Sequence, residues 1–459
     1  MNTTARTAHS VVTGASPVPA PADRGKPVMQ LITGADEFLS IGAAWDRLAL
    51  GDPASTIFQS HTWLRLWWKY FSRKPDRLAV MLFSVDGALI GAAPLFLRTW
   101  RVAGWPVQHQ LRLIGSGELS GNSFGMFLDD GPSDYLNILA LPGWSAVVVS
   151  MIERAILDGT VPCDRLELLN IPEGSPLRGL FRSDARAGEY AGSSTGADIC
   201  PYLPAPAGKE EFLRSLSPGI RRKFSQLSRS LGTDGIFRIR SAASRPEAGK
   251  ILEYLIGLHQ RRWNRLGYPG LFAKPHFAEF FRDLCGELFD RGELWCRVTE
   301  NDSGVFGARI AFRFNGIYFD YLSGFDDHSA MTKHRPGFAL LSGMIDDAIA
   351  GGAREINFLR GDEAYKFELT SAFRRNLNLT LTARAYHGTV RHALWLVAGC
   401  WRFLLTMIAR ERDLLLVQFR INPVHLFLLR YISFRAPKFA KKFSRAVKSE
   451  IPRNEEQSR

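Results

Sequence analysis

The chain has 459 residues, more than one ordinary hydrophobic core can bury, which predicts two domains with tails. Its apolar fraction of 46% and charged fraction of 22% are those of a soluble globular protein. The five cysteines show no CxxC motif and no paired spacing, which favours free thiols in a reducing cytoplasm over a disulfide framework. A net charge of +13 and a pI near 9.7 indicate an anionic partner: nucleic acid, an anionic membrane face or a phosphate-rich cofactor.

Residues 1–27 are rich in Thr, Ala, Ser and Pro and lack an apolar stretch, which predicts a disordered leader rather than a secretory signal. Three further regions follow, at 28–204, 205–386 and 387–459.

After two predicted helices at 209–216 and 220–231, residues 236–385 alternate helical and strand periodicity in the order β, α, α, β, β, β, α, β, α, β. Asn315-Gly316 predicts a type I′ turn between two of the strands. The predicted helices cover 209–216, 220–231, 247–266, 275–291, 337–350 and 363–371, and the predicted strands cover 236–240, 293–299, 305–314, 317–323, 355–359 and 377–385.

Residues 28–204 repeat this plan more faintly. The segment Gly91–Phe96 echoes Gly307–Phe312 at the matching strand. We therefore expect an α/β fold (α+β mixed sheet) of two related units, each a mixed, largely antiparallel sheet flanked by helices. The helices predicted here cover 37–50, 60–71 and 147–157, and the strands cover 78–84, 89–97, 111–114 and 165–170.

Residues 387–459 form a basic tail in which aromatic side chains interleave with arginines, a pattern typical of amphipathic helices on an anionic surface. The alternative is that these helices cover the sheet of the second unit. The long apolar run Ala393–Ala409 is interrupted by Arg402, whereas a membrane span needs about 20 apolar residues, so we do not favour a span.

Several motifs of the second half resemble those of GNAT-fold acyltransferases: Arg262-Trp263 closing a helix, Tyr318–Tyr321 on a strand, Pro336-Gly337 opening a helix, and the string Arg360–Lys366 after a strand. The resemblance is to the CelD-like bacterial group associated with cellulose and exopolysaccharide synthesis, which is similar in turn to the double-GNAT FemAB-type transferases. It implies acetyl-CoA or another acyl-CoA as co-substrate.

GNAT enzymes bind the CoA diphosphate at a helix N-terminus, where free N–H groups and the helix dipole favour an anion. The segment His334–Ala339 departs from the usual Gln/Arg-x-x-Gly-x-Gly/Ala signature only in its His. The resemblance therefore implies a cofactor-binding set of His334, Arg335, Gly337, Phe338 and Ala339. The alternative is an ordinary Pro-Gly helix start.

Direct transfer from a thioester needs a neutral amine, a polarised carbonyl and a proton source for the leaving thiolate. Asp320 is the first candidate for a base or an amine-orienting carboxylate, and Asp362 is the second. Tyr365 is the candidate acid. Alternatives remain open: Asp320 as a paired strand carboxylate, Asp362 as a helix N-cap, and Tyr365 as a packed ring.

Arg262, Trp263 and Lys366 are candidate substrate-binding residues, Lys366 for an anionic acceptor or the cofactor. Asp326-Asp327-His328 has poor ligand geometry, so we assign no metal. No Walker loop, GxGxxG or HExxH motif supports a rival enzyme class.

The sequence thus predicts an enzyme, an acyl-CoA-dependent N-acyltransferase acting on an amino sugar, a polysaccharide precursor or another small amine. One alternative is a FemAB-like transferase that uses aminoacyl-tRNA. Another is a non-catalytic GNAT-fold module at the membrane. The expected partners are an acyl-CoA and an amine acceptor, with an anionic membrane surface reached through the tail, tRNA disfavoured and no DNA. The expected location is cytoplasmic, peripheral to the inner membrane face.

Overall fold

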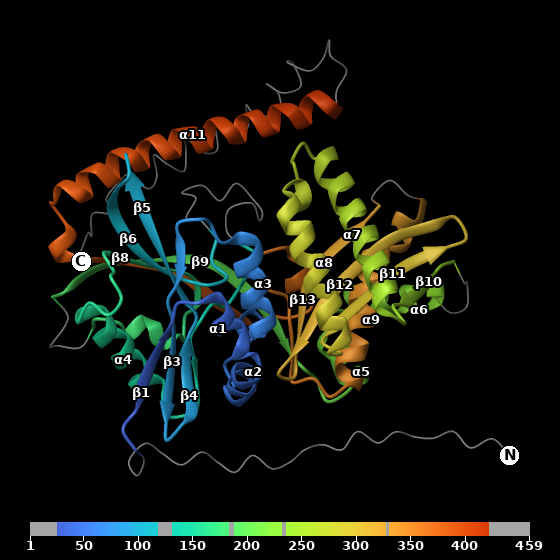
Figure 1. The fold of residues 1–459 in the computed structure, drawn as a ribbon. Helices are drawn as coiled ribbons and strands as arrows, with labels where there is room; N and C mark the ends of the chain where they lie inside the picture. Colours follow the sequence, from blue (N-terminus) through green and yellow to red (C-terminus); the bar gives the residue numbers. More distant parts are fainter. Residues whose placement is uncertain (1–24, 118–130, 183–187, 232–235, 327–329, 422–459) are drawn as a thin grey trace, which may run out of the picture.

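The computed structural model describes residues 25–117, 131–182, 188–231, 236–326 and 330–421 (Figure 1). Most of the expected leader and the last part of the tail, residues 422–459, lie outside these ranges. The elements of the first half are β1 (Val28–Ile32), α1 (Ala35–Ser40), α2 (Gly42–Gly51), α3 (His61–Phe71), β2 (Asp76–Leu78), β3 (Val80–Val85), β4 (Ala88–Ala93), β5 (Leu95–Val102), β6 (Trp105–Leu113), β7 (Leu139–Ala140), α4 (Ser145–Leu157), β8 (Arg165–Pro172) and β9 (Tyr190–Pro204).

The second half follows the predicted order of elements. Asn315 and Gly316 both have positive φ, 48° and 73°, as a type I′ turn requires. The elements are α5 (Lys209–Ser215), α6 (Pro218–Leu231), β10 (Arg238–Ser241), α7 (Arg245–Arg265), α8 (Pro275–Asp290), β11 (Leu294–Asn301), β12 (Gly304–Phe314), β13 (Ile317–Phe325), α9 (Pro336–Ala350), β14 (Glu355–Asn357), α10 (Ala364–Phe367), β15 (Phe373–Ala383) and α11 (Val390–Ile421).

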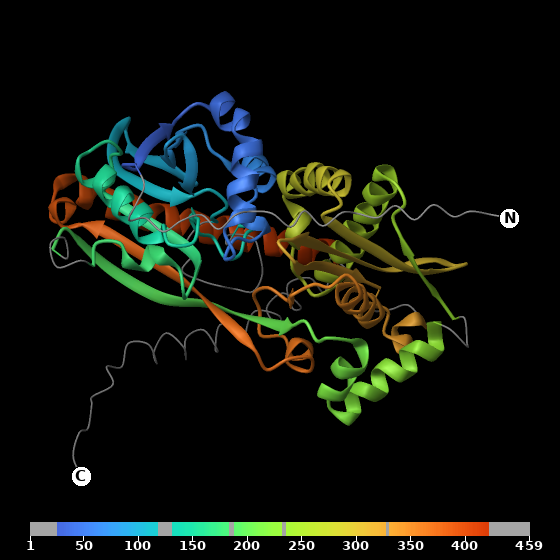
Figure 2. The same cartoon turned by 90° about the horizontal axis from the view of Figure 1, so that it is seen from below.

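The described strands form a four-stranded sheet, β1-β3-β4-β7, and an eleven-stranded sheet, β10-β11-β12-β13-β14-β9-β15-β8-β6-β5-β2. Helices flank both sheets, and most strand pairs are antiparallel, so the predicted fold class of two tandem mixed α/β units is confirmed (Figures 1 and 2).

Two long strands make one sheet out of the two units. β9 pairs with β14 at one end and along β15, and β15 pairs in turn with β8 of the first unit (Figure 2). The sequence analysis missed β9, because its Gly, Ser and Thr residues give no regular alternation of apolar and polar positions.

Two predicted elements of the first half are interrupted. The strand expected at 89–97 breaks at Pro94, which has no N–H for the sheet ladder, so β4 joins the small sheet and β5 the large one. The helix expected at 37–50 divides at Ile41 into α1 and α2. A side chain at Gly42 would meet the His61 ring at 2.9 Å, so this glycine permits the close approach of α3.

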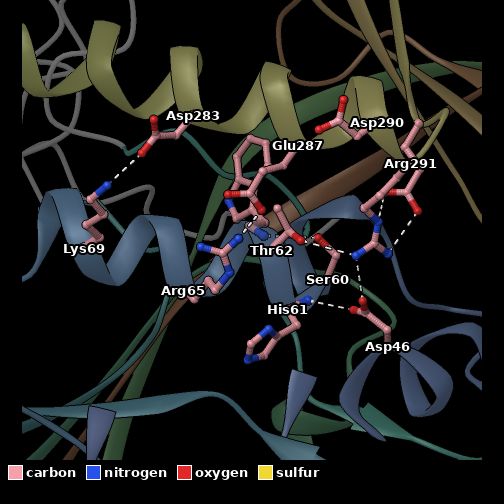
Figure 3. Close-up of polar contacts among 12 residues, drawn as sticks. Asp46, Ser60, His61, Thr62, Arg65, Lys69, Asp283, Glu287, Asp290 and Arg291 are labelled. Atoms are coloured by element: carbon pink, nitrogen blue, oxygen red, sulfur yellow. Dashed lines mark hydrogen bonds and ion pairs between the residues drawn. The ribbon is translucent and has the colours of Figure 1, made fainter. Parts of the chain in front are cut away.

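The two units share a hydrophobic core between α3 and the helices α7 and α8. The Trp63 ring lies 5.3 Å from Phe280 and 5.7 Å from Phe312, edge to face in both pairs. Polar contacts rim this core: Lys69 pairs with Asp283 at 2.8 Å, and Arg65 pairs with Glu287 (Figure 3). The shared core holds the units in one arrangement.

The helix α11 crosses the molecule from the first unit toward the second (Figure 1). It contacts β5 and β6 of the first unit and α7 of the second. It therefore rests on the hairpin of the first unit. The sequence analysis gave packing on the sheet of the second unit as one of two alternatives, and the described part of α11 does not show that packing.

Candidate active site

A cavity with titratable side chains opens where two parallel strands separate. β13 and β14 pair only over Ile317–Phe319 and Glu355–Asn357. The chain then turns toward β9, because the N–H groups of Phe358 and Gly361 donate to the carbonyls of Pro201 and Ile199, each at 3.0 Å. The far half of β13 is left facing a cavity of about 690 Å³.

Asp320 lies on this half of β13, and a buried ion pair holds it. The Arg309 guanidinium donates from Nη1 to both Asp320 carboxylate oxygens, at 2.6 and 2.5 Å, and both side chains are almost fully buried. A carboxylate bound in this way keeps lone pairs for a donor in the cavity. Asp320 is thus a paired strand carboxylate that also lines the cavity.

Tyr365, on α10, also lines the cavity and is 38% exposed. Desolvation, and then the negative charge of Asp320, raise the pKa of Tyr365 above its ordinary value. The phenol is therefore protonated at neutral pH and can donate a hydrogen bond into the cavity.

The neighbouring Lys366 holds the loop that follows β14. Its side chain is buried, and its ammonium group donates to the carbonyl of Arg360 at 2.7 Å and pairs with Glu363 at 2.8 Å. These bonds position the loop and with it Tyr365. Asp362 is exposed and is not among the described residues that line the cavity, and the residue that precedes α10 as its N-cap is Glu363.

The start of α9 forms another wall. The N-cap residue Arg335 has a left-handed backbone conformation, with φ 55° and ψ 57°. Its carbonyl accepts hydrogen bonds from the N–H groups of both Phe338 and Ala339 at 3.0 Å. Arg335, Gly337 and Phe338 line the cavity, whereas Ala339 is fully buried and faces a different crevice.

A second, basic pocket of about 380 Å³ adjoins the cavity between α6 and the start of α9. It shares Lys223, Arg335 and Phe338 with the cavity, and it contains His334. The fold brings basic residues of α6 to the predicted anion-binding helix start. The cationic and imidazole side chains of this pocket are Lys223, Arg229, Lys333, His334 and Arg335.

α7 supplies a third wall. The Arg262 guanidinium lies 4.5 Å from the centre of the Phe325 ring, and Trp263 lines the cavity beside it. His259, which the sequence analysis did not single out, is also a lining residue and is 4% exposed. Burial lowers the pKa of His259 to about 4, so its imidazole is neutral at physiological pH.

The first unit closes the cavity through a short segment around Asp134. The Arg360 guanidinium pairs with the Asp134 carboxylate at 2.8 Å, and the Tyr321 hydroxyl donates to the Pro132 carbonyl at 2.6 Å. Pro132 and Asp134 both line the cavity. The sequence analysis did not identify Asp134, because this contact depends on how the two units pack.

Sequence comparison places residues 219–367 in the family described as "Acetyltransferase (GNAT) domain". No curated protein matches the chain. Among solved structures, FemX is 11% identical, with 81% of this chain and 99% of FemX covered and a TM-score of 0.51. This likeness shows a shared fold across both units.

Two further structures match more weakly. One is the C-terminal domain of a putative lysylphosphatidylglycerol synthetase from Agrobacterium fabrum, with 10% identity, 77% and 94% of the two chains covered and a TM-score of 0.42. The other is a tandem GNAT protein from the clavulanic acid biosynthesis pathway, with 11% identity, 77% and 98% covered and a TM-score of 0.36. The chain contains a GNAT-fold acetyltransferase domain at residues 219–367, which holds the basic pocket and most of the residues that line the cavity, and this domain supports an acyltransferase.

Proposed function

We propose that the protein transfers an acyl group from acetyl-CoA or another acyl-CoA to an amine. This proposal rests on one observation: two pockets adjoin each other and share lining residues. A basic pocket at the start of α9 suits the phosphates of the donor. The adjoining cavity is lined by Asp320 and Tyr365, and we assign the thioester to it. Because both features belong to the second unit, we expect one donor site in each chain.

In the proposed reaction, the amine nitrogen attacks the thioester carbonyl carbon, the C–S bond breaks and an amide forms. Asp320 orients the neutral amine and accepts the proton that the nitrogen loses. Tyr365 donates its proton to the departing thiolate and is protonated again from solvent. Arg309 keeps Asp320 in place, and Lys366 keeps the Tyr365 loop in place. These residues position the two catalytic groups and need not touch the substrate.

We propose an amino sugar or a polysaccharide precursor as the acceptor, as the resemblance to the CelD-like group implies, and a role in exopolysaccharide or cellulose synthesis. Arg262 and Trp263 would contact this acceptor at the α7 wall. We place the protein in the cytoplasm at the inner membrane face, with no role for DNA.

Titration calorimetry with acetyl-CoA, in the presence and absence of total tRNA, tests the donor. We expect one acetyl-CoA bound per chain and no effect of tRNA. Binding of tRNA without acetyl-CoA would favour an aminoacyl-tRNA-dependent transferase, for which the basic pocket is also suited. Two equivalent acetyl-CoA sites would contradict the assignment of the donor to the second unit, and binding of neither would favour a non-catalytic module.

A further inference from the structure

The outer face of α11 carries a continuous apolar stripe. Its residues follow one another at intervals of three or four, so they lie on one side of the helix. Trp401 is 62% exposed and Val397 is 72% exposed. α11 is long and apolar enough to cross a membrane by length and composition, and none of its most apolar window is buried. The residues of the stripe are Val390, Leu394, Val397, Trp401, Leu404 and Ile408.

The inner face of α11 is held on the protein. Arg402 lies 4.1 Å from the centre of the Trp100 ring, and Trp395 stacks at 5.3 Å against the Arg165 guanidinium. Further along, Leu414 is buried, and α11 contacts α7. A helix that crossed a bilayer would have to give up these contacts, so the geometry favours a helix that lies flat along the molecule.

The charge of the chain around and after α11 indicates the kind of surface that covers the stripe. Of the described arginines of α11, Arg391 pairs with Asp164, Arg412 pairs with Asp413 and Arg402 lies over the Trp100 ring. The sequence that follows the helix is basic, with Lys438, Lys441, Lys442, Arg445 and Lys448. An apolar helix face next to a basic segment is the pattern of a chain that attaches to a bilayer with anionic headgroups. A second copy of this strongly basic chain would bring like charges together.

We infer that α11 docks the protein on an anionic lipid surface, with the stripe in the headgroup region and the helix axis parallel to the membrane. With its 32 residues α11 is about 48 Å long, enough to reach from the hairpin of the first unit to α7. The last residues of α7 include Arg262 and Trp263, which line the cavity. Docking therefore holds the α7 wall of the cavity near the membrane. This inference does not depend on acyl transfer.

Co-sedimentation of the full chain with vesicles tests the inference. We expect binding to vesicles of phosphatidylglycerol and phosphatidylethanolamine at low salt, weaker binding at high salt, and little binding to phosphatidylcholine vesicles. Val397→Glu and Ile408→Glu, singly, should each weaken binding by about tenfold, because a carboxylate replaces apolar surface in the interface. Bound protein should be extracted by alkaline carbonate, which a membrane-spanning helix would resist.

Leu50→Glu is the matched control. Leu50 and Ile408 are each 57% exposed, and α2, which carries Leu50, lies far from α11 (Figure 1). The control should bind vesicles like the wild type, and all three variants should keep the melting temperature and the acetyl-CoA affinity of the wild type. Equal vesicle binding by the Ile408 and Leu50 variants, or a wild-type protein that ignores anionic vesicles at low salt, would overturn the inference. A stripe-dependent dimer seen by light scattering without lipid binding would overturn it as well.

Discussion

Replacing Gly337 by glutamate places a carboxylate next to the basic pocket in which the donor phosphates are proposed to bind, between Arg335 and Phe338 of that pocket. Gly337 is the second residue of α9 and lines the cavity. Two unit charges about 4 Å apart repel by about 4 kcal/mol at an effective dielectric constant of 20. Solvent and salt reduce this repulsion at a half-buried position, so we expect a loss of about 1.4–2.8 kcal/mol, or roughly 10- to 100-fold in acetyl-CoA affinity.

Gly337→Gln is the matched control, because it adds the same bulk without the charge. A Cβ at this position would lie 3.2 Å from the Phe325 ring, so both variants displace that ring slightly. A carboxylate in the first turn of α9 interacts favourably with the helix dipole, so the glutamate variant should be no less stable than the glutamine variant.

The assays are titration calorimetry with acetyl-CoA and thermal unfolding of each variant. The reasoning requires the glutamate variant to bind more weakly than the glutamine variant while both remain folded. Equal losses in the two variants would mean that bulk alone explains the effect. Unchanged affinity in both would refute the placement of the phosphates at α9.

The remaining predictions concern the cavity. Asp320→Asn and Tyr365→Phe should each slow acyl transfer by about 100-fold or more with little change in acetyl-CoA affinity, and a steady-state assay paired with calorimetry checks this. Arg309→Met should lower the free energy of unfolding by about 3–5 kcal/mol, because it leaves the Asp320 carboxylate buried without its partner, whereas adding Asp320→Leu should recover most of that stability in denaturant titrations. The folded-state pKa of His259, about 4, lies below its ordinary value of 6.5, so the folded protein binds the proton less readily than the unfolded chain. The free energy of unfolding should therefore fall by about 3 kcal/mol as the pH decreases from 6.5 to 4, because the unfolded chain binds a proton at His259 that the folded protein does not. His259→Gln should remove this decrease from the pH–stability profile.

The order of elements in the second half could be predicted from the sequence, because local rules determine it. Apolar residues recur with the helical period along α7 and α8, and the Asn315-Gly316 turn depends only on the φ angles of its own two residues. The start of α9 was recognised in the same way, since Pro336 and Gly337 act through their own backbone.

The first half was predicted less well because its breaks depend on neighbours. Pro94 and Ile41 divide elements that appear continuous in their apolar pattern. β9 was missed because a strand with little apolar alternation is stabilised by its partners, β14 and β15, and not by its own residues.

Tertiary structure alone decided which side chains meet in the cavity. The pairing of Arg309 with Asp320 could have been suspected, since Arg309 lies two residues along the same strand from Ala311, which is the partner of Asp320 across the hairpin. The contact of Asp134 with Arg360 joins residues from different units and leaves no local pattern. Periodicity and turn chemistry act over a few residues and can be read along the chain, whereas contacts between the units follow from how their cores pack, which no single stretch of sequence encodes.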